Sequence, residues 1–299
     1  MNEHLDALVI GAGPAGLTAA IYLGRFRRRF VVVENHASRA GWIPKSHNLP
    51  GFPDGVGGEE LLQRLRAQAE RYGAVIRRGQ VEGLERQGEG FLATLADGET
   101  IQARKVLLAT GVADNELGHE AFRDGVRRGL VRICPICDGY EAIDRCIAVI
   151  GDGEKVVREA LFLKTYSHDL AVIHLGEPRT MGDAERRQLA EAGIALIETP
   201  IADVLIEADR IVALDFGKGQ VRRFDLIYSA LGTTPRAAQA WRLGAAADPA
   251  GCLQVNAHQE TSVPGLYAAG DLVRGLNQIT VAEAEAAIAA TDIHNRLTG

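Results

Sequence analysis

The sequence predicts an α/β protein with two doubly wound domains. A short apolar strand, a glycine turn and a helix follow one another near residue 10, and the same order recurs near residue 150. A second apolar strand comes after each helix, as in a parallel sheet. The chain has 299 residues, of which 46% are hydrophobic, so it can bury two cores.

The first region has the complete pattern of a Rossmann-like unit. We expect a buried strand from Leu5 to Ile10, a helix over 15–23 and a second strand over 30–33, closed by Glu34. The turn between strand and helix reads Gly11, Ala12, Gly13, Pro14, Ala15, Gly16. Its glycines would let the backbone approach a pyrophosphate, and the helix N-terminus would attract that anion. Glu34 can accept hydrogen bonds from a ribose, so the sequence predicts a dinucleotide site here.

The second region repeats the pattern less completely. Strands are expected over 146–150 and 170–175, with a helix over 154–163. Gly151 and Gly153 occupy the turn, but the final small residue of the motif is replaced by Val156. A bulky residue there hinders close packing of helix and strand.

Further elements are expected between and after these two regions. They are an amphipathic helix over 59–72, short strands over 75–95 and a buried strand over 105–109 that leads into Thr110 and Gly111. The chain closes with a motif from Gly265 to Asp271 and an alanine-rich helix over 280–297.

Charge and composition argue against several classes of partner. The net charge is −6, and the one basic cluster (Arg25, Arg27, Arg28 and Arg29) is expected to be a solvated turn, so we expect no nucleic acid partner. No apolar run approaches the about 20 residues that span a bilayer, and no signal peptide is recognisable. Four cysteines do not make a disulfide scaffold. We therefore expect a cytoplasmic protein without membrane contact.

Two cysteines stand at the spacing of redox pairs. Cys134 and Cys137 are separated by Pro135 and Ile136, so their sulfurs can meet across one turn and form a reducible disulfide. Zinc is the rival interpretation, but a zinc site usually needs four ligands. Cys146 and Cys252 are isolated in the sequence and are expected to be small buried side chains, so we expect no metal site.

Three motifs together resemble one family. Thr110-Gly111 is similar to the turn that follows an apolar strand in flavoproteins with two dinucleotide folds, and 265–271 to their second FAD motif. Cys134-Pro135-Ile136-Cys137-Asp138-Gly139-Tyr140 resembles the Cys-X-X-Cys-Asp-Gly motif of low-molecular-weight thioredoxin reductases. The resemblance covers essentially the whole chain, and the motifs come in the family's order.

The resemblance implies a domain layout. Residues 1–113 and 243–299 would form a discontinuous FAD-binding domain, and 114–242 an inserted NAD(P)-binding-like domain that carries the cysteines. It also implies a homodimer that exchanges electrons with thioredoxin or a similar redox protein. Domains of the family rotate about two short connections, here near 112–115 and 242–244, and whether they do so in this chain is left open.

The resemblance also implies roles for single residues. Cys137 would face the flavin, Cys134 would exchange with the partner disulfide, and Asp138 would give and take thiol protons. FAD would be held by residues of both ends of the chain: Gly11, Gly13, Pro14, Ala15, Gly16, Glu34, Thr110, Gly111, Gly270, Asp271, Asn277, Gln278 and Ile279. The helix that follows Asn277 would place its N-terminus beside the flavin ring.

Two departures from the family concern the cofactors. In the second region, the family's usual arginine pair for a 2′-phosphate is missing after the strand over 170–175. The chain has His174, Leu175, Gly176, Glu177, Pro178 and Arg179 there instead. Glu154 also adds a negative charge at the glycine turn, which Lys155 partly offsets. The electron donor is therefore left open between NADPH, NADH and a small protein such as ferredoxin or flavodoxin. In the flavin region the family has Gly-Gly-Gln where this chain has Ala40-Gly41-Trp42, and Trp42 either packs on the flavin ring or is a core or interface residue.

Three functions follow from these observations. The first is reduction of thioredoxin or a similar protein disulfide by FAD and the Cys134–Cys137 pair. The second reverses the electron flow, so that a dithiol substrate reduces the enzyme and oxygen reoxidises it. The third is a flavin-containing redox sensor or binding module, against which the intact cysteine pair argues.

Overall fold

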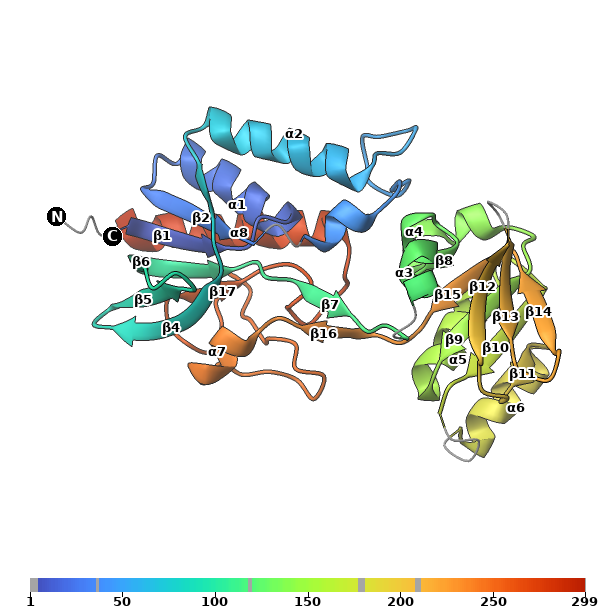
Figure 1. Cartoon of the computed structure of the whole chain (residues 1–299). Coiled ribbons are helices and arrows are strands. Elements are labelled where there is room, and N and C mark those ends of the chain that lie inside the picture. The colour runs from blue at the N-terminus through green and yellow to red at the C-terminus, as the bar shows by residue number, and fades with distance from the viewer. Residues whose placement is uncertain (1–4, 36–37, 118–119, 177–180, 208–210, 299) are drawn as a thin grey trace. The chain divides into compact units, whose positions relative to one another are not determined.

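The computed structural model describes residues 5–35, 38–117, 120–176, 181–207 and 211–298 (Figure 1). The chain divides into two compact units. The first contains Met1–Lys45, Leu49–Ala113 and Thr234–Gly299, and the second contains Ser46–Asn48 and Asp114–Thr233. Residues 234–242, expected in the inserted domain, thus group with the first unit. No helix among the described residues is long and apolar enough to cross a membrane.

The first unit is built on a mixed sheet of seven strands. Their order is β3-β2-β1-β6-β5-β4, and β17 also pairs with β6. Pairing is parallel from β3 through β6 and for β17, and antiparallel among β4, β5 and β6. The strands are β1 (Leu5–Ile10), β2 (Phe30–Glu34), β3 (Val75–Arg78), β4 (Val81–Gln87), β5 (Gly90–Leu95), β6 (Thr100–Leu108) and β17 (Leu266–Ala268).

Helices from both ends of the chain pack together in this unit. They are α1 (Pro14–Arg25), the short 3₁₀ helix η1 (Arg39–Trp42), α2 (Gly58–Arg71) and α8 (Ile279–Thr298), while the short α7 (Ala238–Arg242) lies apart from them. Alanines of α8 are fully buried against α1, because small side chains let two helices approach closely. The α7 helix packs near β4, where Gln239 donates a hydrogen bond to the carbonyl of Val81.

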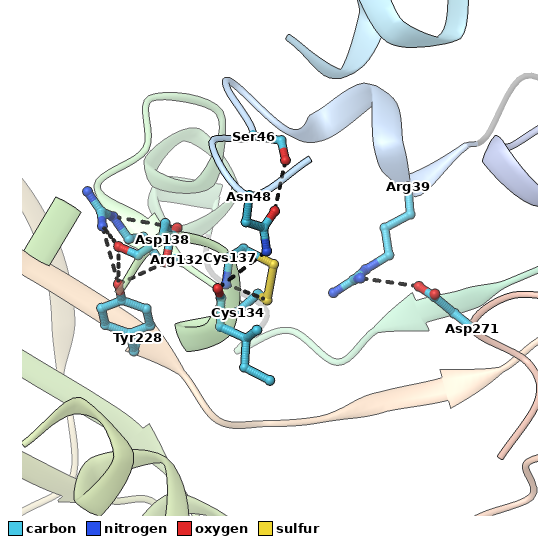
Figure 2. The surroundings of a disulfide bond; sticks show 10 residues. Arg39, Ser46, Asn48, Arg132, Cys134, Cys137, Asp138, Tyr228 and Asp271 are labelled. Atoms are coloured by element: carbon cyan, nitrogen blue, oxygen red, sulfur yellow. Dashed lines mark hydrogen bonds and ion pairs between the residues drawn. A yellow bond between two sulfur atoms is a disulfide. The ribbon is translucent and has the colours of Figure 1, made fainter. Parts of the chain in front are cut away.

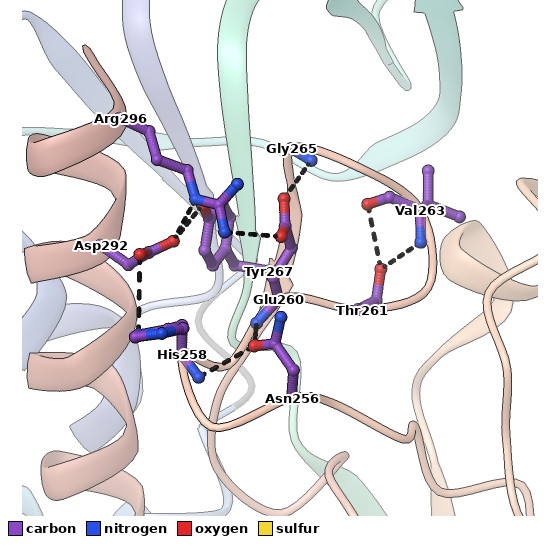
Figure 3. A network of polar contacts seen from close by, with 9 residues as sticks. All are labelled: Asn256, His258, Glu260, Thr261, Val263, Gly265, Tyr267, Asp292 and Arg296. Atoms are coloured by element: carbon purple, nitrogen blue, oxygen red, sulfur yellow. Dashed lines mark hydrogen bonds and ion pairs between the residues drawn. The ribbon is translucent and has the colours of Figure 1, made fainter. Parts of the chain in front are cut away.

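Polar contacts fix α8 to the loop before β17 (Figure 3). The buried Tyr267 donates its hydroxyl proton to Asp292 Oδ2 at 2.7 Å. Arg296 then bridges Asp292, at 2.7 Å, and Glu260, at 3.1 Å. Between these two residues of α8, His294 accepts hydrogen bonds from Arg28 at Nδ1 and at its backbone carbonyl, so this member of the basic cluster has a structural role.

The second unit has a parallel sheet of five strands in the order β11-β10-β9-β15-β8. These strands are β8 (Val131–Arg132), β9 (Ile147–Gly151), β10 (Leu170–His174), β11 (Ala195–Ile197) and β15 (Leu226–Ser229). An antiparallel sheet adds β12 (Asp203–Glu207), β13 (Ile211–Asp215) and β14 (Val221–Phe224). The helices are α3 (Glu120–Arg127), α4 (Pro135–Asp138), η2 (Tyr140–Ala142), α5 (Gly153–Leu163) and α6 (Asp183–Glu191).

The chain passes between the units through two short strands. They are β7 (Val112–Asp114) and β16 (Thr233–Pro235), which pair with each other. Each unit thus contains the strand, turn, helix, strand order that the sequence predicts, and the predicted α/β class with two doubly wound sheets is confirmed.

Candidate active site

The turn after β1 accepts only glycine at two of its positions. Gly11 has φ +108°, and a Cβ added there would lie 2.3 Å from the carbonyl oxygen of Ala109. A Cβ at Gly16 would lie 1.8 Å from the carbonyl oxygen of Gly11. Pro14 opens α1, and Gly13 caps it without a side-chain hydrogen bond. The N-terminal amides of α1 are therefore bordered by backbone and small side chains, which fits a pyrophosphate.

Glu34 ends the neighbouring strand β2, at the same edge of the sheet as this turn. Its side chain is largely buried, and Arg66 of α2 donates to Oε1 at 2.5 Å. The arginine holds the carboxylate in one orientation, as a ribose site requires. Arg66 was not predicted, because its contact depends on how α2 packs and not on any local motif.

The C-terminal motif lies next to the first turn. Gly270 has φ +85°, and a Cβ added there would lie 3.2 Å from the Cβ of Ala15 and 3.5 Å from that of Ala282 in α8. Asp271 accepts from Arg39 Nη1 at 3.3 Å (Figure 2). Asn277 and Gln278 immediately precede the start of α8 at Ile279. Residues far apart in the sequence are thus brought to one end of the sheet.

Three further predicted residues have clear positions. Thr110 follows β6, and its backbone nitrogen would be 3.3 Å from a Cβ on Gly11, while its hydroxyl donates to the carbonyl of Arg236. Gly111, beside it, has φ +63°. Trp42 ends η1 with 48% of its surface exposed, so it is not part of the core of this unit.

A disulfide joins Cys134 and Cys137 in the second unit (Figure 2). Cys134 precedes the short helix α4, and the backbone N–H of Cys137 donates to Cys134 Sγ at 3.2 Å. Such an amide stabilises a thiolate on that sulfur once the bond is reduced. The described residues contain no cluster of three or more metal-ligating side chains.

Asp138, directly after Cys137, has a carboxyl group that is mostly buried. Burial raises the pKa of Asp138 from 3.8 to about 6, and Glu141 adds to the rise. The Arg132 guanidinium and a hydrogen bond from Tyr228 act in the opposite direction on this pKa. A carboxyl group that titrates near neutral pH suits proton exchange with thiols.

The turn after β9 differs from the one after β1. Asp152 caps α5 with its own carboxylate, which accepts from the backbone N–H of Gly153 at 2.7 Å. Its Oδ1 also lies 3.4 Å from Nδ1 of the buried His174. Glu154 stands in the first turn of α5, and Val156 is fully buried between helix and sheet. The Asp152 carboxylate thus accepts an N–H at the start of α5 that a bound anion could otherwise use, while Glu154 points to solvent and pairs with Arg158 at 3.8 Å.

The remaining candidates from the sequence are Lys155, the segment 177–179 and the two isolated cysteines. Lys155, expected to offset Glu154, pairs instead with Glu159 at 3.7 Å. Glu177, Pro178 and Arg179 fall outside the described residues. Cys146 and Cys252 are half-buried free thiols, and burial raises the pKa of both, that of Cys146 to about 11, so neither is a strong nucleophile at neutral pH.

Comparisons with known proteins agree with this geometry. A family model described as pyridine nucleotide-disulphide oxidoreductase matches residues 5–286. A thioredoxin reductase of Streptomyces coelicolor is 31% identical over 91% of this chain and 87% of its own length. The structure of HlmI superposes with a TM-score of 0.91 at 29% identity, covering 100% of this chain and 94% of that one. Thioredoxin reductase from Streptococcus pyogenes superposes at 0.89 with 27% identity, covering 100% and 99%.

Proposed function

Because this chain belongs to the pyridine nucleotide-disulphide oxidoreductase family and is a thioredoxin reductase-like oxidoreductase, we propose that it uses FAD to reduce thioredoxin or a similar protein disulfide. The observation that carries the proposal is the Cys134–Cys137 disulfide with Asp138 beside it, a carboxyl group whose pKa is raised to about 6. A structural disulfide has no use for such a neighbour, whereas thiol exchange moves protons on and off sulfur, which a carboxyl group can assist.

The first unit would hold the FAD. Gly11, Gly13, Pro14, Ala15 and Gly16 would surround the pyrophosphate, and Glu34, oriented by Arg66, would bind the ribose. The site would be completed by residues after β6, after β17 and at the start of α8, namely Thr110, Gly111, Gly270, Asp271, Asn277, Gln278 and Ile279. Trp42 is a candidate contact of the flavin ring. A bound flavin supplies a carrier of two electrons.

The cysteines would divide the work as they do in the family. Cys137 would exchange electrons on the flavin side, and Cys134 would attack the disulfide of the partner. The amide of Cys137 supports this assignment, since it donates to the Cys134 sulfur and would favour the thiolate there. We expect the protein to act as a homodimer in the cytoplasm.

The donor is proposed to be something other than NADPH. The Asp152 carboxylate already occupies the N-terminus of α5, and Glu154 adds charge of the same sign as a phosphate. A small redox protein such as ferredoxin or flavodoxin would need no nucleotide site, while NADH would have to bind against these charges.

The same observation supports one alternative, a dithiol oxidase. If a small dithiol reduced the Cys134–Cys137 disulfide, electrons would pass to the flavin and then to oxygen, and no nucleotide site would be needed. Oxygen uptake with dithiols alone, stopped by Cys134→Ser, would establish the oxidase. Oxygen uptake no faster than that with free flavin and the same dithiol would rule out the oxidase.

The proposed reduction can be tested without knowing the donor. The FAD-loaded protein is photoreduced without oxygen and mixed with oxidised thioredoxin. We expect the absorbance of oxidised flavin to return while thioredoxin gains an equivalent amount of thiols. The double variant Cys134→Ser/Cys137→Ser should keep its flavin reduced. Equal transfer by both proteins, or by neither, would contradict the proposal. Separate titrations with NADPH, NADH and reduced ferredoxin then identify the donor.

A further inference from the structure

The Asp138 carboxyl group lies within a compact polar cluster of the second unit (Figure 2). Tyr228 Oη is 2.8 Å from Asp138 Oδ1, and Arg132 Nη1 is 3.2 Å from Tyr228 Oη. Arg132 Nη1 also donates to the backbone carbonyl of Asp138 at 2.6 Å, and its Nε is 3.7 Å from Oδ2. The guanidinium therefore contacts both the carboxylate and the hydroxyl that binds it.

The sheet places two members of this cluster side by side. Strands β15 and β8 are parallel neighbours, and Tyr228 is paired with Arg132 in their register. Paired residues point to the same face of a sheet, so both side chains reach toward α4. A shift of β8 against β15 by one residue would turn Arg132 to the other face of the sheet, away from Tyr228 and Asp138.

The tyrosine hydroxyl has no evident purpose in packing. The Tyr228 ring is completely buried in the core of the unit, where phenylalanine would fill the same volume without a polar atom. Burial and the nearby Asp138 carboxylate raise the pKa of Tyr228, so the hydroxyl keeps its proton. It can therefore donate to Asp138 in either charge state of the carboxyl group while accepting from Arg132.

We infer that Arg132 and Tyr228 are positioning residues that hold the Asp138 carboxyl group ready for proton exchange with Cys134 and Cys137. The inference rests on the proposed function, since it assigns a purpose to Asp138 in thiol exchange. The contacts that support this role join Arg132 and Tyr228 to Asp138 and to each other. The two residues act through Asp138.

The proton inventory of the exchange shows what this carboxyl group does. Asp138 takes the proton of the Cys134 thiol, and the Cys134 thiolate attacks the partner disulfide, which breaks while a mixed disulfide forms. The first leaving thiolate receives the proton from Asp138. The carboxylate then takes the proton of Cys137, whose sulfur attacks Cys134 Sγ and expels the second thiolate, which is protonated in turn. Two electrons and two protons thus pass from the enzyme to its partner.

The groups around Asp138 set the pH at which this cycle works. Burial and Glu141 favour the neutral carboxyl group, while Arg132 and Tyr228 favour the carboxylate. The opposing effects leave the pKa at about 6, where the group can both accept and donate near neutral pH. Without either positioning residue, the carboxyl group would stay protonated to higher pH.

The test uses the infrared carboxyl band of Asp138, identified by its loss in Asp138→Asn, in the oxidised holoprotein. We expect its titration midpoint to rise by about one pH unit in Tyr228→Phe and further in Arg132→Gln. The matched control is Tyr267→Phe, which removes a hydroxyl that also binds an aspartate, in the first unit. That control should lose comparable stability and leave the Asp138 midpoint unchanged.

A second readout follows the thiols. The reduced protein is mixed with the small disulfide 5,5′-dithiobis(2-nitrobenzoate), and the rate of exchange is measured against pH. The midpoint of this profile should move upward with the infrared midpoint in Tyr228→Phe and Arg132→Gln, and stay in place in Tyr267→Phe.

Unchanged midpoints in both Tyr228→Phe and Arg132→Gln would overturn the inference, even if the exchange rates fell. If one variant does not fold, the other decides. Neither readout needs thioredoxin or an electron donor. Shifted midpoints in a protein that fails to reduce thioredoxin would therefore refute the proposed function and leave the positioning role of the two residues intact.

Discussion

Both units contain a strand, a glycine turn and a helix in this order, but the residues at the N-terminus of the helix differ between them. In the first, α1 is capped by Gly13 without a side-chain hydrogen bond and has no acidic residue in its first turn. In the second, α5 is capped by the carboxylate of Asp152 and carries Glu154 in its first turn. The same strand, glycine turn and helix therefore present different surroundings to an anion in the two units. The side chains at the helix N-terminus decide whether an anion can bind there.

The third small residue of the motif shows the same contrast. At Gly16 even a methyl group would overlap the carbonyl of Gly11. At the corresponding Val156 the side chain is accommodated in the core between α5 and the sheet. The second unit has kept the fold of a nucleotide domain while carrying the disulfide and the Asp138 cluster.

The largest effect should come from filling the first turn. Gly16→Val would place a side chain where the Gly11 carbonyl lies at 1.8 Å, so the turn must open. We expect FAD affinity to fall by about 100-fold or more, equivalent to about 3 kcal/mol. Flavin absorbance per protein after dialysis measures it. The control is Val156→Ala, which should keep its flavin, and a yellow Gly16→Val protein would contradict the assignment of the FAD site.

Asp138 should give the next largest effect, on stability. Its folded pKa is raised by about two units, and each unit corresponds to about 1.4 kcal/mol, so burying its charge costs about 3 kcal/mol as an order of magnitude. The pKa of Asp138 is higher in the folded than in the unfolded protein. Its contribution to the free energy of unfolding is therefore fully present below about pH 4 and is lost as the pH rises through about 6. Asp138→Asn should thus gain stability relative to wild type between these values. Urea unfolding of the oxidised proteins at several pH values measures the gain, and parallel curves would show that the carboxyl group is not buried as described.

Opening the second turn should have a smaller effect. In Asp152→Gly/Val156→Ala the carboxylate leaves the N-terminus of α5 and the motif regains a small residue. We expect NADH and NADPH to bind about tenfold more tightly than in wild type, because one repulsive charge near the phosphates is removed. Calorimetric titration measures both affinities. Tight binding of either nucleotide to the wild-type protein would show that the Asp152 cap does not block the site.

The smallest effect tests the cap itself. Asp152→Ala removes the acceptor of the Gly153 N–H and should destabilise the second unit by about 1 kcal/mol. Asp152→Asn keeps an acceptor and should lose less. Thermal unfolding compares the two variants, and equal stability of Asp152→Ala and wild type would mean that the cap contributes nothing in solution.

The sequence predicted the parts of the site that depend on local rules. Strand lengths, the glycine turns and the cysteine spacing follow from backbone conformation and residue type over short distances. The Asp152 cap could also have been predicted from the sequence, since aspartate is a preferred residue at the N-cap of a helix. The expectations for this turn concern its glycines, Glu154, Lys155 and Val156, and do not include a cap by Asp152.

The partners of the predicted residues could not be found this way. Arg66 reaches Glu34 across 32 positions, and Tyr228 reaches Asp138 across 90. The second contact depends on the β15–β8 register, which the hydrophobic pattern of two short buried strands does not specify. Arg39 likewise meets Asp271 only because both chain ends share one sheet.

The most direct test of the account is the number of electrons that the FAD-loaded protein accepts. Without oxygen, dithionite should deliver two electrons to the flavin and two to the Cys134–Cys137 disulfide. The double variant Cys134→Ser/Cys137→Ser should need half as much dithionite for complete bleaching of its flavin. Equal requirements in both proteins would show that the disulfide exchanges no electrons with the flavin, and would contradict the account.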